Sequence, residues 1–351
     1  MSFIKTRFNT PNTHPSAPIA LDSAQYLALT ALRQRGQLSR THLAEVIGYS
    51  PSKITGLVND LIGGGILEET DDSTYTGGRR AKDLYFNPAY GYIVGVVIGV
   101  DKLDVAVIDA RENVRVRRMV SIQPEDSPVR IMESLSRIVL ERLQQLSIPI
   151  ERVYGVGVTL PTAIDSRKHT PYASAALPAW GGYQLESYLR EVFPYAVVMI
   201  ERDANGMAFA ELRRGAGRYL NHLLYLNLGE PVGVGIILDG HIYRGANGRA
   251  GMMLDLPNAL SDTLPIEDSA QWIGRALAQL VNFIDPELIL VGGDSPHVGA
   301  SFLASLRRSI LDYSQSLATQ HLQIDLAPLG TEANLTGITL LTAEAIFTVA
   351  K

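Results

Sequence analysis

The sequence predicts an α/β protein in two parts, a small N-terminal part of helices with a β-hairpin and a larger part built by duplication. Two patterns support this prediction. In residues 37–86, two short amphipathic helical segments separated by a glycine precede two β-prone segments. From Tyr92 onward, three β-prone segments followed by alternating helices and strands occur twice in succession. That repeat is the layout of a duplicated α/β domain with a cleft between its halves.

Two helix caps and one turn define the helical pair in the N-terminal part. Ser39 is placed to cap a short helix, and Gly48 supplies the left-handed turn that ends it. Ser50 caps the second helix, and Pro51 stands at its first position, where a missing N–H costs nothing. Four apolar residues at spacings i, i+3, i+4 and i+7 are expected to form the buried face of this second helix: Ile54, Leu57, Val58 and Leu61.

The opposite face of the second helix is polar and carries little bulk, which suits the major groove of DNA. A hairpin between the β-prone segments 66–69 and 83–86 follows, and its tip holds three cations. Caps, turn, polar face and basic tip occur in the order of a winged helix-turn-helix, so we predict that this part binds double-stranded DNA. The residues predicted to contact DNA are Arg40, Ser50, Ser52, Lys53, Thr55, Asn59, Arg79, Arg80 and Lys82.

The helical pair also has an interpretation without DNA. Two short amphipathic helices joined by a glycine turn occur in many helical domains that do not bind nucleic acid. In that interpretation Lys53 is an ordinary solvated lysine, and Arg79 and Arg80 form the tip of a soluble loop. The agreement among caps, turn, polar face and basic tip favours the DNA-binding interpretation.

The larger part is expected to contain the same series of elements twice. Short β-prone runs predict strands, and longer segments with apolar residues at helical spacing predict helices. In the first half, strands are expected at 93–100, 103–108, 114–120, 153–160 and 196–200, and helices at 128–146, 183–193 and 204–213. In the second half, strands are expected at 223–228, 234–238, 241–243, 288–291 and 322–326, and helices at 266–283, 299–316 and up to Ala343.

Length and composition allow two or three domains, because the chain has 351 residues, of which 46% are apolar and 19% charged. We assign residues 1–20 to a flexible tail, 21–90 to the winged helix-turn-helix, and 91–351 to a two-lobed domain for effector binding and oligomerisation. Cysteine is absent and the seven histidines show no metal-ligand spacing, so no metal site is expected. No apolar run has the length of a membrane span, and the expected location is cytoplasmic.

The charge is divided unevenly along the chain. Residues 1–90 hold nine Lys/Arg against eight Asp/Glu, a net charge of +1, whereas the remainder has a net charge of −6. A weakly basic N-terminal part should have only modest non-specific attraction to phosphate. Specific binding should therefore need two copies on paired half-sites, so we expect a homodimer or homotetramer.

Short motifs occur in a fixed order along the chain, at 39–44, 48–50, 78–80, 95–99, 201–205, 240–248, 284–287 and 292–293. From about Leu21 to the end, this series resembles the ROK family (repressors, open reading frames and kinases), specifically its regulators with an N-terminal winged helix. The resemblance implies an actin-like ATPase fold of the ROK sugar kinase type. In the kinase members of the family, the central cleft of that fold binds a sugar and ATP.

The phosphate loops depart from those of the kinase members. Val97 stands where the family has a metal-side carboxylate, and Asp101 stands where a hydroxyl would meet phosphate. In the second loop, Glu230 adds negative charge and Pro231 removes an N–H donor. Since phosphoryl transfer depends on N–H groups and cations around the phosphates, we expect neither ATP binding nor any other cofactor.

The segment that carries the family's catalytic aspartate also departs from the kinase pattern. Asp203 has the position of the catalytic base, and we expect it to be catalytic only if the protein is a kinase. Arg202 replaces the expected asparagine, Asp255 ends the segment that matches the family's Glu-x-Gly-His, and the cysteines of the family's zinc segment are absent. The residues expected to face an effector are Arg202, Asp203, Asn205 and Asp255.

Taken together, these features predict a transcription regulator without kinase activity, a repressor of carbohydrate-use genes that responds to a sugar-like effector. Effector binding would close the cleft and change the spacing of the two DNA readers. Two alternatives stay open. One is an ATP-dependent sugar kinase with an attached DNA-binding domain, and the other is an effector-independent DNA-binding protein whose large domain only dimerises.

Overall fold

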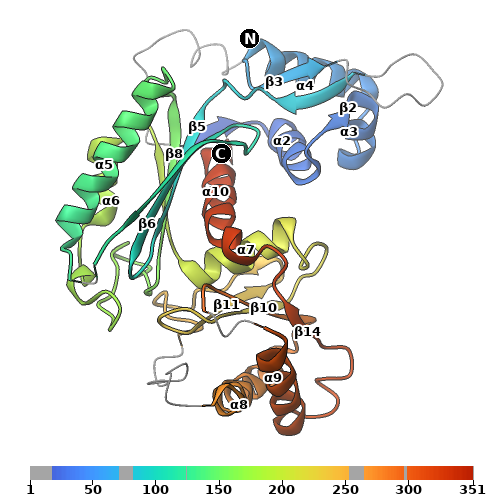
Figure 1. The fold of residues 1–351 in the computed structure, drawn as a ribbon. Coiled ribbons are helices and arrows are strands. Elements are labelled where there is room, and N and C mark those ends of the chain that lie inside the picture. The colour runs from blue at the N-terminus through green and yellow to red at the C-terminus, as the bar shows by residue number, and fades with distance from the viewer. Residues whose placement is uncertain (1–17, 71–81, 124, 253–264, 296–298, 351) are drawn as a thin grey trace.

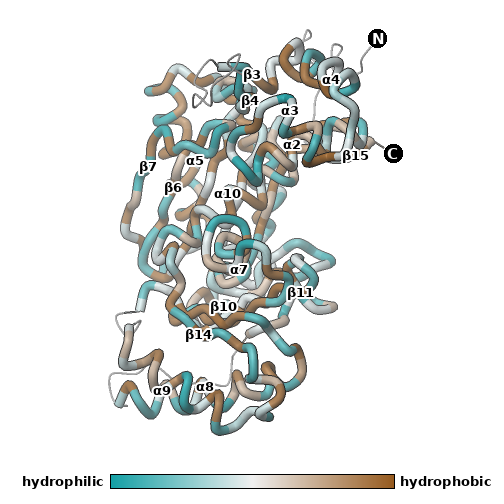
Figure 2. Tube along the Cα trace, turned by 90° about the vertical axis from the view of Figure 1, so that its right-hand side faces the viewer, coloured by the Kyte–Doolittle hydropathy of each residue, from teal (hydrophilic) through white to brown (hydrophobic). Residues whose placement is uncertain are grey.

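The computed structural model describes residues 18–70, 82–123, 125–252, 265–295 and 299–350. Figure 1 shows an N-terminal unit beside a two-lobed body, with helices α7 (Asp203–Arg214) and α10 (Ala333–Ile346) between the lobes. In the view of Figure 2, the N-terminal unit lies at one end of the molecule, and α8 (Ile266–Ile284) and α9 (Ala300–Tyr313) lie at the other. None of the described helices is long and apolar enough to cross a membrane.

The described part of the N-terminal unit contains three helices and a small sheet. Its elements are α2 (Ser23–Arg35), β2 (Leu38–Ser39), α3 (Arg40–Ile47), α4 (Pro51–Gly63), β3 (Leu67–Thr70) and β4 (Asp83–Phe86), with strand order β2-β4-β3. The helical pair α3–α4 and both strands of the hairpin lie where the sequence predicts them. Most of the predicted hairpin tip, with Arg79 and Arg80, lies outside the described residues.

The predicted caps and turn of the helical pair are confirmed. Ser39 Oγ accepts a hydrogen bond from the His42 N–H at 3.3 Å, and Ser50 Oγ accepts one from the Lys53 N–H at 3.4 Å. Gly48 has φ 70° and ψ 30°, in the left-handed region where a side chain is strained. The four residues of the predicted apolar face of α4 are all buried: Ile54, Leu57, Val58 and Leu61.

Helix α2 has no counterpart among the predicted elements. It begins with a capping box, in which Asp22 accepts a hydrogen bond from the Gln25 N–H at 2.8 Å and the Gln25 side chain accepts one from the Asp22 N–H at 3.2 Å. Its inner face, which includes Ala28 and Leu32, packs into the core of the unit. Alanine supplies much of that face, so the apolar periodicity in the sequence is weak, although the Asp-x-x-Gln spacing is a recognisable start signal.

A two-stranded parallel sheet ties the N-terminal unit to the other end of the chain. Strand β1 (Ile19–Leu21) pairs with β15 (Phe347–Val349), and the Ala350 N–H donates to the Leu21 carbonyl at 2.7 Å. Because β1 leads into α2 and β15 follows α10, this pairing anchors the N-terminal unit on α10. The flexible tail expected over residues 1–20 was therefore placed too far along the chain, since Ile19 and Ala20 belong to a strand.

The two lobes contain sheets of the same topology, which confirms the predicted duplication. The first lobe contains β5 (Tyr92–Ile98), β6 (Lys102–Asp109), β7 (Val114–Ser121), β8 (Val153–Leu160) and β9 (Val197–Arg202), in the order β7-β6-β5-β8-β9. The second contains β10 (Leu223–Asn227), β11 (Gly233–Leu238), β12 (His241–Ile242), β13 (Leu288–Gly292) and β14 (Gln323–Leu326), in the order β12-β11-β10-β13-β14. In each sheet a three-strand antiparallel meander is extended by two parallel strands.

The remaining helices cover these sheets. The first lobe carries α5 (Pro128–Gln145) and α6 (Leu185–Val192), and the second carries α8 and α9, which pack against each other (Figure 1). Short 3-10 helices join elements within the described residues: Ile150–Arg152, Pro178–Trp180 and Gly330–Glu332.

Helix α10 is buried on all sides, and it packs closely against α7. A Cβ atom added at Gly337 of α10 would lie 1.8 Å from the carbonyl oxygen of Gly206 on α7. On another side of α10, a Cβ atom added at Gly157 of β8 would lie 2.1 Å from Thr342 Oγ1. Most residues of α10 are buried, as expected of a helix that is apolar around its whole circumference. The position of α7 relative to the first sheet therefore depends on α10.

We expect Gly337→Ala to lower the free energy of unfolding by about 1–3 kcal/mol, because the added methyl group has no space beside the α7 backbone. Thermal or urea denaturation would measure this change. Gly56→Ala in α4 is the matched control, because a Cβ atom at Gly56 meets nothing within 4 Å. This control should stabilise the protein by about 0.5–1 kcal/mol, and equal effects of the two substitutions would contradict the packing argument.

Candidate functional site

The outward face of α4 is polar and exposed along its length. Ser52, Lys53, Thr55 and Asn59 are all exposed, whereas the apolar residues between them are buried. Two hydroxyl groups on this helix are used within it, since Ser50 caps the N-terminus and Thr55 Oγ1 donates to the Pro51 carbonyl at 2.9 Å. The face that the sequence predicts for DNA is thus accessible and contains no large apolar side chain.

Arg40 connects three elements of the N-terminal unit. Its Nε lies 2.5 Å from Glu69 Oε1 on β3, and its Nη1 donates to Asn59 Oδ1 at 3.0 Å and to the Thr55 carbonyl at 3.3 Å. The Arg40 side chain is 28% exposed. Arg40, which the sequence predicts to contact DNA, is therefore hydrogen-bonded within the protein. There it holds α4 at a fixed angle to the hairpin, and Glu69 offsets its positive charge.

Lys53 lies over an aromatic ring that sequence reasoning did not single out. Its Nζ is 3.7 Å from the ring centroid of Tyr49, the residue before the cap of α4. This cation–π contact restrains the lysine above the helix start. Lys82, just before β4, is exposed, and Arg79 and Arg80 lie outside the described residues.

A cavity of about 470 Å³ lies between the two lobes. It is bounded by the turn after β5, the start of α7, the loop after β10 and the start of α10. The residues that line it are 97–102, Pro161, Asp203, Met207, 227–230, Asp294, Ser295 and Asn334. Both loops that the sequence assigns to degenerate phosphate sites, with Asp101 and Glu230, thus meet at this central cavity.

The central cavity is acidic. Its described lining includes four carboxylates (Asp101, Asp203, Glu230 and Asp294) and one cation, Lys102. Lys102 is itself paired with Asp294. A polyphosphate would therefore face an excess of negative charge, and like charges in a partly desolvated site repel strongly.

Asp203 stands at the first position of α7 and faces the central cavity. Its Oδ1 accepts a hydrogen bond from the Ala204 N–H at 2.6 Å, and its Oδ2 accepts one from Asn227 Nδ2 at 2.9 Å. Burial raises the pKa of Asp203 to about 6, although Arg202 and the two hydrogen bonds oppose this rise. The carboxyl group therefore exchanges its proton near neutral pH, which suits either a general base or a hydrogen-bonding contact to a ligand.

Arg202 and Asn205 do not line the central cavity but are buried beside it. Arg202 Nη2 donates to Asn205 Oδ1 at 2.9 Å and to the Val234 carbonyl, and Asn205 Nδ2 donates to Glu201 Oε1 at 2.8 Å. Burial lowers the pKa of Arg202, and its Nε and Nη1 have no hydrogen-bond partner among the described residues. Of the four predicted effector contacts, Asp203 alone is placed in the lining of this cavity, and Asp255 lies outside the described residues.

A second cavity of about 270 Å³ lies beyond Glu201, and sequence reasoning missed it. Glu201 Oε2 pairs with Arg244 at 2.6 Å, and across the cavity His169 Nδ1 lies 2.9 Å from Glu186 Oε2. Arg244 belongs to the motif at 240–248, so that motif was the available signal. Among the described residues, no three His, Asp or Glu side chains converge as a metal site would require.

Comparison with known proteins relates this geometry to one family. Residues 93–253 match the profile of the ROK family. The xylose repressor of Bacillus spizizenii is 27% identical over 229 residues, which cover 65% of this chain and 59% of that protein. The xylose repressor of Caldicellulosiruptor bescii is 22% identical over 372 residues, covering 89% and 93%. The transcriptional dual regulator NagC of Escherichia coli is 25% identical over 220 residues, covering 62% and 53%. The matches to the Bacillus repressor and NagC thus span little more than half of those proteins.

Solved structures share the fold. A ROK family transcriptional regulator, described as a homolog of the E. coli MLC protein, has a TM-score of 0.69 at 19% identity and covers 92% of this chain and 96% of its own. A ROK family glucokinase from Streptomyces griseus, in complex with glucose and AMPPNP, has a TM-score of 0.58 at 21% identity, covering 72% and 99%. The family match shows that residues 93–253 form a ROK family domain, and the repressor relatives and the solved structures are similar to the chain in sequence or in fold.

Proposed function

We propose that this protein is a cytoplasmic, DNA-binding transcription regulator, a repressor of carbohydrate-use genes that is controlled by a sugar-like effector and has no kinase activity. The observation that carries the proposal is the exposed polar face of α4, presented by a capped helical pair and followed by a hairpin. The names of the relatives, xylose repressor and NagC, support the same function. In this proposal residues 21–90 form a winged helix-turn-helix and residues 91–351 bind the effector and oligomerise.

The proposed mode of DNA binding places α4 in the major groove. Ser52, Lys53, Thr55 and Asn59 would meet base edges or phosphates, and Tyr49 would orient the Lys53 ammonium group. Arg40 would contribute by holding α4 against the hairpin, in addition to any contact with the DNA backbone. The hairpin residues Arg79, Arg80 and Lys82 would lie in or beside a minor groove.

The effector proposed for the central cavity is a neutral polyhydroxylated molecule. The described lining of the cavity contains four carboxylates and one lysine, Lys102, which is paired with one of them, Asp294. A wall rich in acceptors suits a ligand rich in hydroxyl donors, as sugars are. The same carboxylates disfavour ATP, which supports the absence of kinase activity.

A path of packed elements connects the central cavity with the DNA reader. Asp203 begins α7, α7 packs on α10, and α10 continues into β15, which pairs with β1 ahead of α2. Closure of the lobes around an effector would shift α10 and, through β15, reorient the reader. Operator affinity would change because two readers must match the spacing of paired half-sites.

Self-association through the second lobe supplies the second reader in this proposal. The α8–α9 pair and the segment after it expose large apolar side chains, among them Trp272 (56% exposed), Phe283 (85%) and Leu317 (80%). Exposed apolar groups of this size on one helical pair are typical of a protein–protein interface. We therefore propose a homodimer joined at this face.

The second candidate function is an ATP-dependent sugar kinase with an attached DNA-binding domain. It is favoured by Asp203, which keeps the position and the raised pKa of a general base. It requires the purified protein to phosphorylate a sugar and Asp203→Asn to abolish that activity. An effector-independent DNA-binding protein would instead show no change in melting temperature with any sugar.

We expect Lys53→Ala to weaken binding to an operator, selected from a random duplex pool, by about tenfold, because it removes a cation from the reading face. Fluorescence anisotropy at fixed salt would measure the affinity. Lys168→Ala, in an exposed lysine of the first lobe, is the control and should bind as the wild type does. Equal operator affinities of Lys53→Ala and Lys168→Ala would remove α4 from the DNA interface. A sugar found by thermal-shift screening should alter the operator affinity of the wild type and of Lys168→Ala.

We expect Asp203→Asn to stabilise the protein above neutral pH. The folded state raises the pKa of Asp203 to about 6, so the wild-type free energy of unfolding falls as pH rises from about 4 to about 6. Asparagine carries no charge to desolvate, and a reversed Asn227 amide could accept its N–H, since Asn227 Oδ1 lacks a partner among the described residues. The gain should be about 1–3 kcal/mol at pH 8 and vanish near pH 4 in urea denaturation. A gain independent of pH would rule out the carboxylate as its source.

We expect Phe283→Asp to convert the dimer to a monomer and to lower operator affinity, because a charge would be buried in the proposed interface. Light scattering coupled to size-exclusion chromatography would give the mass. Tyr219→Asp, at an aromatic residue that is 90% exposed and lies outside the α8–α9 pair, is the control and should leave the mass unchanged. A dimeric Phe283→Asp variant would exclude this face.

A further inference from the structure

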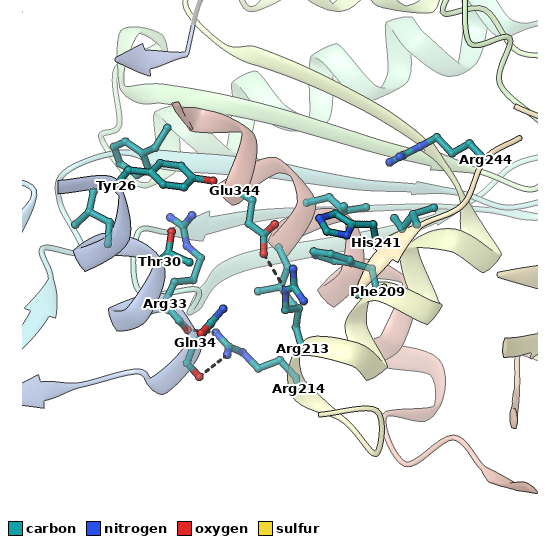
Figure 3. Close-up of a pocket in the computed structure, with 16 residues that line it drawn as sticks. Tyr26, Thr30, Arg33, Gln34, Phe209, Arg213, Arg214, His241, Arg244 and Glu344 are labelled. Carbon is teal, nitrogen blue, oxygen red and sulfur yellow. Dashed lines mark hydrogen bonds and ion pairs between the residues drawn. The ribbon is translucent and has the colours of Figure 1, made fainter. Parts of the chain in front are cut away.

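A third cavity, of about 320 Å³, lies at the junction between the N-terminal unit and the body (Figure 3). Side chains from α2, α7, β12, α10 and β15 line it, so the walls come from both the proposed reader and the effector domain. Its volume is at the lower end of the range for small-molecule sites. We call it the junction cavity.

The junction cavity has the opposite charge to the central cavity. Four arginines line it, Arg33, Arg213, Arg214 and Arg244, together with one described carboxylate, Glu344. Two carboxylates outside the lining offset part of this charge, because Glu112 pairs with Arg33 and Arg214 and Glu201 pairs with Arg244, and the four arginines still exceed the three carboxylates. Figure 3 shows Arg33, Arg213 and Arg214 gathered where α2 and α7 meet, with Glu344 directed toward Arg213. An anion would therefore be attracted to the junction cavity and repelled from the central one.

Arg244 is paired with Glu201, and two further arginines, Arg214 and Arg33, are held by structural contacts. Arg214 donates to the carbonyls of Gln34 and Arg33 at the end of α2, and its Nη2 lies 2.7 Å from Glu112 Oε2. Arg33 Nη1 donates to the Ala343 carbonyl of α10 at 2.6 Å. Both satisfy carbonyl groups near helix C-termini, where the helix dipole favours cations.

Arg213 has a different environment. Its Nε donates to Glu344 Oε1 at 3.0 Å, and among the described residues its side chain makes no other hydrogen bond. Its guanidinium carbon lies 4.6 Å from the centroid of the Phe209 ring. The Glu344 side chain is 41% exposed. Glu344 can therefore move away, and the planar guanidinium would then present paired donors to a carboxylate or phosphate.

We infer that the junction cavity binds a small organic anion, whose carboxylate or phosphate replaces Glu344 on Arg213 and whose remainder packs against Phe209 and Phe347. Both rings belong to the wall of the cavity. This ligand is distinct from the neutral effector proposed for the central cavity. Because it would contact α2 together with α7 and α10, it fixes the angle between the N-terminal unit and the body, and DNA and ligand affect each other's affinity.

The test uses the full chain and three probes: inorganic phosphate, glucose 6-phosphate and glucuronate. Isothermal titration calorimetry should detect binding of at least one of these probes. Comparing the affinity for phosphate with the affinity for glucuronate shows whether the site prefers a phosphate or a carboxylate. Arg213→Gln should weaken that binding roughly tenfold or more, because it removes a charge-assisted pair of hydrogen bonds. Glu344→Gln should tighten it, since the competing carboxylate is gone. Because the two substitutions should change the affinity for the probe in opposite directions, misfolding of the variants cannot explain both results.

Two control variants locate the site. Arg218→Gln removes an arginine that lies over Tyr219, outside the cavity, and should bind the probe as the wild type does. Asp203→Asn alters the central cavity and should also leave probe binding intact, even if the effector proposal fails. Absence of binding by all three probes, undiminished binding by Arg213→Gln, or loss of binding in Asp203→Asn would overturn the inference.

Discussion

The close packing of α10 against α7 is the contact on which the rest of the structure depends. Gly337 and Gly206 let the two helix backbones approach without side chains between them. With that spacing, Asp203 at the start of α7 and Asn334 at the start of α10 reach the same central cavity, and the two sheets lie on either side. The far end of α10 leads into β15, which anchors the N-terminal unit through β1. One buried helix thus positions the cavity, the lobes and the proposed reader.

Charge divides the molecule into chemically distinct regions. The described lining of the central cavity presents four carboxylates, which would repel a polyphosphate. The junction cavity presents guanidinium groups, partly because three helices, α2, α7 and α10, end near it.

The sequence predicted the elements whose signals are local. Caps at Ser39 and Ser50, the turn at Gly48 and the strands of both lobes depend on neighbouring residues, and all were found. The β1–β15 pair was missed because three-residue strands gain their stability from a partner far away in the sequence. For the site, the family resemblance assigned Asp101 and Glu230 to the two phosphate loops of one cleft, and both residues line the central cavity. Hydrophobic periodicity alone does not indicate that these two loops meet.

Side-chain partners were the least predictable part. Sequence reasoning placed Arg40 on DNA, but a single sequence does not reveal that Glu69 and Asn59 lie within hydrogen-bond distance of it. Arg202 and Asn205 were expected in the effector site, yet Glu201, their immediate neighbour, draws them into a buried network. The junction cavity depends on how α2 sits on the body, and α2 itself was not predicted.

The pairing of β1 with β15 has a consequence for biosynthesis. The helices of the N-terminal unit, α2, α3 and α4, are synthesised before either lobe. Strand β1, however, finds its partner only after β14 and α10 have been made. Until then, contacts with the first lobe, such as the hydrogen bond from Arg111 Nε to the Phe86 carbonyl at 2.8 Å, can hold the N-terminal unit on the body. A chain that stops before β15 would lack the strand pair that joins β1 to the end of α10, so complete docking requires synthesis to pass α10.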